Sequence, residues 1–207
     1  TGVQTCALPI CPLSADMDTY GRITLDFQET IEAITGSVDL LAEPLEQASN
    51  RIVASLLAEG KVMCCGTGAS AAMAQLLVGL LLHRFEHERP ALPAMNLCAD
   101  AATLAGIGAS TGANEIFSRQ IRALGQPADV LVCFSNEASN PSIIQAVSAA
   151  HERGIHVISL SGSAPVDISS VLLAEDLELA VRALRAPRIT RSEEHTSELQ
   201  SQFRISY

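Results

Sequence analysis

The hydrophobic pattern of this chain changes its period near residue 60. Before that point, apolar residues recur every three or four positions over residues 23–35 and 38–59, which is typical of amphipathic helices. We expect the first helix to end near Gly36 and the second at Gly60, because glycine often follows the last periodic residue of a helix. The pattern therefore predicts two N-terminal helices, whose apolar stripes need a sheet or a partner subunit to cover them.

After residue 60, short apolar runs alternate with helical segments. The runs have the length of buried strands and lie at 61–65, 93–98, 129–134, 155–160 and 176–182. The helical segments between them cover residues 70–83, 100–106, 114–124 and 141–153. Strands that are apolar on both faces and separated by helices are typical of a parallel sheet covered on both sides. The sequence thus predicts an α/β fold, a three-layer, doubly wound sheet of five parallel strands with N-terminal helices.

Two polar segments follow strands of this predicted sheet. The turn GTGAS, residues 66–70, opens one helix, and SNEASN, residues 135–140, precedes a helix that begins with Pro141. Ligands of open α/β sheets bind at the carboxyl ends of the strands, and free N–H groups at helix starts favour an anion such as phosphate. Two alternatives stay open: Ser70 is an ordinary N-cap, and Glu137 either repels phosphate or points to water.

Composition narrows the class of protein. The chain has 13 Lys and Arg against 23 Asp and Glu, a net charge of −10, and Lys61 is its single lysine, which argues against a nucleic-acid surface. No apolar stretch reaches the length needed to span a membrane. The cysteines at the apolar runs include no CxxC pair and are typical of buried thiols in a reducing compartment, so we expect a cytoplasmic protein.

The two ends of the chain resemble a translated sequencing-library adapter. ACTGGAGTTCAGACGTGTGCTCTTCCGATC encodes residues 1–10, and its reverse complement, with one base added ahead of it, encodes RSEEHTSELQ from Arg191. We therefore expect residues 1–10 and 191–207 to be non-native and exclude them from the interpretation of the fold. Residues 11–190 are then expected to form a single domain that is truncated at its C-terminal side.

The remaining sequence resembles the sugar-isomerase (SIS) domain over about residues 22–190. The blocks that carry the resemblance are CCGTGASAAMAQ, HRFEHERPALPA, NEIFSRQIRALGQPADVLVCFSNEASNPSII and AHERGIHVISLSG. Within this family the chain is similar to phosphoheptose isomerases and to their relative, the DnaA initiator-associating protein. The resemblance implies a homotetramer with sites between subunits. Active members isomerise sedoheptulose 7-phosphate with a zinc ion and an acid/base pair.

The functional positions that the resemblance implies are partly changed here. The family's CGNGGS turn is CGTGAS, and its phosphate loop STSGNS is SNEASN. A His and a Glu of the family, which bind zinc and transfer protons, are replaced by Leu76 and Leu80, and leucine offers neither a metal ligand nor a titratable group. We therefore expect no catalytic residue and no bound zinc. The predicted substrate contacts are Thr67, Gly68, Ser70, Arg84, Ser135, Asn136 and Asn140.

These changes predict a SIS-domain protein that keeps the fold without the isomerase chemistry. It is expected to be catalytically inactive, and to bind a phosphosugar weakly or to act through a protein partner. One alternative is an active sedoheptulose 7-phosphate isomerase with an altered site, in which Glu115, Gln120 or a residue beyond Thr190 supplies the base. Another is a regulator of replication initiation that binds a DnaA-type protein, which rests on family analogy alone. A purely structural product is the third.

Overall fold

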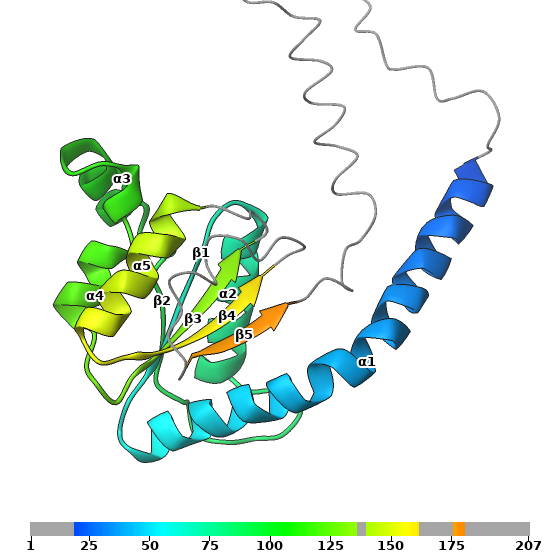
Figure 1. The fold of residues 1–207 in the computed structure, drawn as a ribbon, viewed down its shortest axis with the longest axis horizontal. Helices are drawn as coiled ribbons and strands as arrows, with labels where there is room; N and C mark the ends of the chain where they lie inside the picture. Colours follow the sequence, from blue (N-terminus) through cyan, green and yellow to red (C-terminus); the bar gives the residue numbers. More distant parts are fainter. Residues whose placement is uncertain (1–18, 136–139, 162–175, 181–207) are drawn as a thin grey trace, which may run out of the picture. The chain divides into compact units, whose positions relative to one another are not determined.

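The computed structural model describes residues 19–135, 140–161 and 176–180. Residues Ile34–Arg185 form one compact unit, which contains the sheet. Its strands are β1 (Val62–Gly66), β2 (Ala94–Asn96), β3 (Val130–Ser135), β4 (His156–Ser161) and β5 (Leu177–Ala180). All neighbouring pairs are parallel and the order is β2-β1-β3-β4-β5 (Figure 1). The predicted five-stranded parallel sheet is confirmed.

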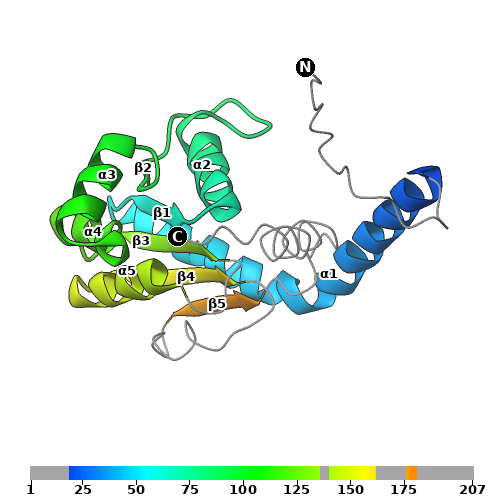
Figure 2. The same cartoon turned by 90° about the horizontal axis from the view of Figure 1, so that it is seen from above.

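Helices cover both faces of this sheet, as the apolar runs predict. After α1 (Thr19–Leu57) the helices are α2 (Ala69–Leu82), α3 (Ala101–Ser110), a 3-10 turn η1 (Ala113–Glu115), α4 (Ser118–Leu124) and α5 (Pro141–Glu152). Figures 1 and 2 show α4 and α5 on one side of the strands and α2 on the other. Among the described helices, none is long and apolar enough to cross a membrane.

Alternate residues of each strand enter two separate cores. On β1, Met63 and Cys65 join the core under α4 and α5, whereas Val62 and Cys64 join the core under α1 and α2. All four side chains are fully buried. Successive side chains of a strand point to opposite faces, so a strand buried on both faces must be apolar throughout. This is why β1 appears in the sequence as an unbroken apolar run.

The prediction of two N-terminal helices is wrong, because α1 runs without a break from Thr19 to Leu57. Gly36 lies inside the helix instead of ending it. A glycine within a helix costs only about 1 kcal/mol relative to alanine, and the apolar repeat continues through it. Pro44 also lies inside α1, at a cost of about 3 kcal/mol from the lost N–H hydrogen bond and the clash with the preceding turn.

Gly60 follows the end of α1, but for a different reason from the one expected. Glu59, not Gly60, takes the left-handed backbone conformation, with φ of 61°. The Gly60 N–H donates to the carbonyl of Ser55 at 2.9 Å. A Cβ on Gly60 would lie 2.2 Å from the carbonyl oxygen of Ala128. Glycine is therefore required by the close approach of α1 to the segment that leads into β3.

Candidate functional site

The sheet has a topological switch point between β1 and β3. The chain leaves β1 for α2 and then β2, which pairs with one edge of β1, while β3 pairs with its other edge. From β3 the chain enters α5, on the opposite face of the sheet, and continues outward to β4. Connections that leave neighbouring parallel strands in opposite directions open a crevice at their carboxyl ends, where ligands bind. The two polar segments predicted from the sequence flank this crevice.

The glycine turn after β1 has a geometry that only glycine supports at two positions. A Cβ on Gly66 would lie 2.7 Å from the carbonyl carbon and oxygen of Ser70, both of which are backbone atoms. Gly68 is the N-cap of α2 and has φ of 55° and ψ of −127°, in a region that other residues rarely adopt. The N-cap is therefore Gly68 rather than Ser70. The tight turn brings the first turn of α2 close to the end of β1.

Asn140 joins the two polar segments across the crevice. Its side-chain oxygen caps α5 by accepting hydrogen bonds from the backbone N–H groups of Ser142 and Ile143, at 3.1 and 3.4 Å. Its side-chain nitrogen donates to the hydroxyl of Thr67 at 2.8 Å. The side chain is buried, with 7% of its surface exposed. One amide thus fixes the start of α5 against the glycine turn that starts α2.

Two helix N-termini therefore meet at one place. Helix α2 begins at Ala69 and α5 at Pro141, immediately after neighbouring strands end. Each N-terminus carries a partial positive charge and N–H groups without intrahelical partners, so two together favour an anion more than one alone. Small hydroxyl side chains lie at the same edge: Ser70 is 4% exposed and Ser135 is 2% exposed. In chemical terms this edge suits a phosphate group.

The structure brings most of the predicted substrate contacts together. Thr67, Gly68, Ser70, Ser135 and Asn140 all lie at the carboxyl ends of β1 and β3. Asn136, together with Glu137, lies outside the described residues.

Arg84 does not join these residues within one chain. It follows α2, whose 14 residues separate it from the glycine turn, a distance of about 20 Å along the helix axis. Its guanidinium forms an ion pair with Glu88, and both side chains are exposed.

The two positions at which the resemblance implies zinc ligands do not fit a metal ion. Leu76 and Leu80 lie four residues apart on α2, on the side away from the buried Ala74 and Val78. Leu76 is 56% exposed and Leu80 is half-buried. Neither side chain has a donor atom for a metal. Within the described part of the chain, no group of three or more His, Cys, Asp or Glu residues could hold a metal ion.

Glu115 and Gln120, the alternative bases, are both engaged in structural contacts. Glu115 accepts a hydrogen bond from the Ser118 hydroxyl at 2.6 Å and pairs with Arg122 at 3.0 Å. The hydrogen bond from Ser118 and the interaction with Arg122 lower the pKa of Glu115, which makes it a weaker base. The Gln120 amide nitrogen donates to the carbonyls of Leu97 and Ile116. These contacts fix α4 rather than present a proton acceptor to the crevice.

Two residues near the crevice were not predicted from the sequence. Ser161 ends β4, is 3% exposed and pairs in register with Ser135, which places it at the same edge of the sheet. The thiol of Cys98 donates to the carbonyl of Gly66 at 3.2 Å and joins the ends of β2 and β1. Burial raises the pKa of the Cys98 thiol. Both placements depend on strand pairing between distant segments, so no local pattern reveals them.

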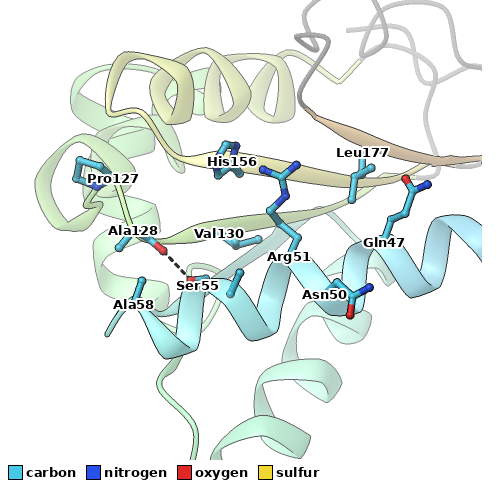
Figure 3. Close-up of a pocket in the computed structure, with 11 residues that line it drawn as sticks. Gln47, Asn50, Arg51, Ser55, Ala58, Pro127, Ala128, Val130, His156 and Leu177 are labelled. Atoms are coloured by element: carbon cyan, nitrogen blue, oxygen red, sulfur yellow. Dashed lines mark hydrogen bonds between the residues drawn. The ribbon is translucent and has the colours of Figure 1, made fainter.

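A second cavity lies at the opposite, amino ends of the strands. It has a volume of about 640 Å³ and lies between α1 and the start of β3, β4 and β5 (Figure 3). Arg51 extends from α1 toward His156 at the start of β4, and the Ser55 hydroxyl donates to the carbonyl of Ala128 at 2.7 Å (Figure 3). None of the predicted substrate contacts lines this cavity.

Comparison with known proteins identifies the family. The SIS domain model matches residues 26–185. The chain is 42% identical to a phosphoheptose isomerase from Chromohalobacter salexigens over 173 residues, which cover 84% of this chain and 88% of the relative. It is 38% identical to a phosphoheptose isomerase from Coxiella burnetii, over 84% of this chain and 87% of the relative.

Solved structures agree with this result. A phosphoheptose isomerase from Francisella tularensis superposes with a TM-score of 0.79 at 32% identity, covering 85% of this chain and 92% of the other. One from Neisseria gonorrhoeae gives a TM-score of 0.76 at 36% identity, covering 84% and 92%. The similarity extends over nearly the whole length of each relative.

Proposed function

Because the chain belongs to the SIS domain family, we propose that it binds a sugar phosphate in the crevice between β1 and β3. The observation that carries the proposal is the hydrogen bond from Asn140 to Thr67, which holds two helix N-termini at the switch point of the sheet. The phosphate lies against the first turns of α2 and α5. Homology to phosphoheptose isomerases makes a seven-carbon sugar phosphate the first ligand to test.

We further propose that the chain does not isomerise this ligand by the zinc-dependent route. Isomerisation of a sugar requires a group that removes and returns a proton, and a general base works best with a pKa near the working pH. Leu76 and Leu80 have no titratable group. Glu115 is paired with Arg122, and its pKa is lowered rather than raised. The described residues of the crevice therefore bind and orient an anion without a candidate base.

Binding is tested by thermal unfolding of the full chain with sedoheptulose 7-phosphate, inorganic phosphate or unphosphorylated sedoheptulose. A ligand at one hundred times its dissociation constant stabilises the folded state by about 2.7 kcal/mol, which raises the Tm by about 5–10 °C. We expect this increase with the sugar phosphate and none with the free sugar. Equal effects of phosphate and sugar phosphate would mean that the crevice recognises the anion alone.

A matched pair of serine variants locates the site. Ser70→Ala removes a hydroxyl beside the first turn of α2 and is expected to weaken binding, whereas Ser110→Ala changes an exposed serine at the end of α3 and is expected to leave it unchanged. The inactivity proposal is tested separately by following conversion of sedoheptulose 7-phosphate by NMR, with added zinc and with a chelator. Steady turnover under either condition would show an active isomerase with an altered site.

A further inference from the structure

Helix α1 carries a heptad repeat that the sugar-phosphate site does not explain. Apolar residues are separated alternately by four and three positions, at Phe27, Ile31, Ile34, Val38, Leu41, Leu45, Ala48 and Ile52. A repeat of this kind over more than three heptads is the pattern of helices that pack against other helices in coiled coils. The helix has 39 residues, about three times the usual length in globular proteins. A periodic helix of this length is typical of helix–helix association.

The two halves of the repeat have different surroundings. Near the C-terminal end, Ala48 is buried and Ile52 packs against the core that contains Val62 and Val130. Toward the N-terminal end, four consecutive members of the repeat are exposed: Phe27 is 67% exposed, Ile31 61%, Ile34 51% and Val38 57%. We call these four residues the α1 seam. Large apolar side chains gathered in one row on a helix mark an interaction surface.

The charges beside the seam indicate which partner it fits. The positions that flank a heptad seam hold Gln28, Thr30, Thr35 and Ser37, none of which is charged. The acidic residues of this segment, Glu29, Glu32 and Asp39, occupy positions away from the seam. Flanking charges set partner choice in paired helices, and a basic partner would be matched by acidic flanks. Neutral flanks instead allow two identical chains to pair, although each carries a net charge of −10.

We propose that the α1 seam packs against the α1 seam of a second copy of this chain. This contact is independent of the proposed sugar-phosphate site, since none of its residues belongs to the crevice. It gives the exposed half of the heptad repeat the apolar partner that the sheet gives to the other half. Because the flanking residues are uncharged, the association depends only weakly on salt.

The test is the molar mass of the full chain in solution, measured by sedimentation equilibrium from 1 to 100 μM. The wild-type chain is expected to have at least twice the monomer mass of 21.8 kDa. The double variant Ile31→Glu, Ile34→Glu places four carboxylates in each seam pair and is expected to sediment as a monomer, with a dissociation constant raised at least a hundredfold. Because both positions are more than half exposed in the single chain, its circular dichroism is expected to match that of the wild type.

Leu40→Glu is the matched control. Leu40 is 69% exposed on the same helix but lies outside the seam, so this variant is expected to keep the wild-type mass. A milder change, Gln28→Glu with Thr35→Glu, leaves the seam apolar but adds like charges beside it. It is expected to weaken association at low salt and to recover at high salt. A monomeric wild type, or a seam variant that associates like the wild type while remaining folded, would overturn the proposal.

Discussion

Gly66→Ala is the substitution with the clearest expected effect on the glycine turn. The added methyl group would meet the carbonyl carbon and oxygen of Ser70 at 2.7 Å and the nitrogen of Ala71 at 3.0 Å. All three are backbone atoms of the first turn of α2, so no side-chain rotation relieves the clash. The start of α2 must move away from β1. This movement would also displace the N–H groups that are proposed to bind phosphate.

The expected loss of stability follows from the size of this clash. Extra atoms forced into a well-packed site cost about 1–3 kcal/mol, and a fixed backbone obstacle places this change in the upper part of that range. For a chain of this size, a loss of about 2–3 kcal/mol lowers the Tm by about 4–12 °C. Sugar-phosphate binding is expected to weaken as well.

Gly79→Ala provides a control with the opposite sign. Gly79 lies within the same helix, and a Cβ there would meet nothing within 4 Å. Alanine is favoured over glycine in a helix by about 0.5–1 kcal/mol, so the Tm is expected to rise by a few degrees and binding to be kept. Both variants are measured by thermal unfolding and by titration with sedoheptulose 7-phosphate. If Gly66→Ala has the stability and affinity of the wild type, the described turn geometry is wrong.

Three further predictions concern single side chains. Asp129→Asn is expected to destabilise the fold by about 2–3 kcal/mol in urea titrations, because the 2% exposed carboxylate accepts from the N–H groups of Lys61 and Gln126 and pairs with the Lys61 ammonium at 2.6 Å. Thr67→Val removes the acceptor for Asn140 and is expected to cost about 1 kcal/mol and to weaken sugar-phosphate binding, with Thr111→Val on exposed α3 as the control. Burial raises the pKa of Cys64 from 9.0 to about 12; because the unfolded thiol ionises first, stability is expected to be constant below pH 9.0 and to fall from there toward pH 12, and Cys64→Ala is expected to flatten this fall in urea midpoints.

The fold could be predicted where local pattern decides it. The five strands were found because each is buried on both faces and therefore apolar at consecutive positions. The helix starting at Pro141 was found because Asn140 and Pro141 are typical of the first turn. The break at Gly36 was predicted wrongly, because a single glycine is a weak signal that the continuing heptad repeat outweighs. Gly60 could not be explained from sequence, since its role depends on Ala128, which lies 68 positions further along the chain.

The candidate site could be predicted in part for the same reason. Thr67, Ser70 and Asn140 stand out because they lie in polar segments directly after apolar runs, and strand ends meet at one edge of a parallel sheet. The contact between Thr67 and Asn140 joins residues 73 positions apart, so it could be placed at that edge but not as a pair. Ser161 was missed because it continues β4 without a polar segment around it.

The position of Arg84 bears on how a complete site is assembled. Ser70 lies in the first turn of α2 and Arg84 beyond its last turn, about 20 Å apart along a rigid helix, whereas a sugar phosphate spans roughly half that length. No rotation of side chains within one chain lets both contact the same ligand. If Arg84 contributes to sugar-phosphate binding, it does so in the crevice of another copy. Arg84→Ala in a chain kept monomeric by the seam variant is then expected to leave affinity unchanged, while the same substitution in the associated chain lowers it. An equal loss of affinity in both backgrounds would show that Arg84 acts within its own chain and that the described path of α2 is wrong.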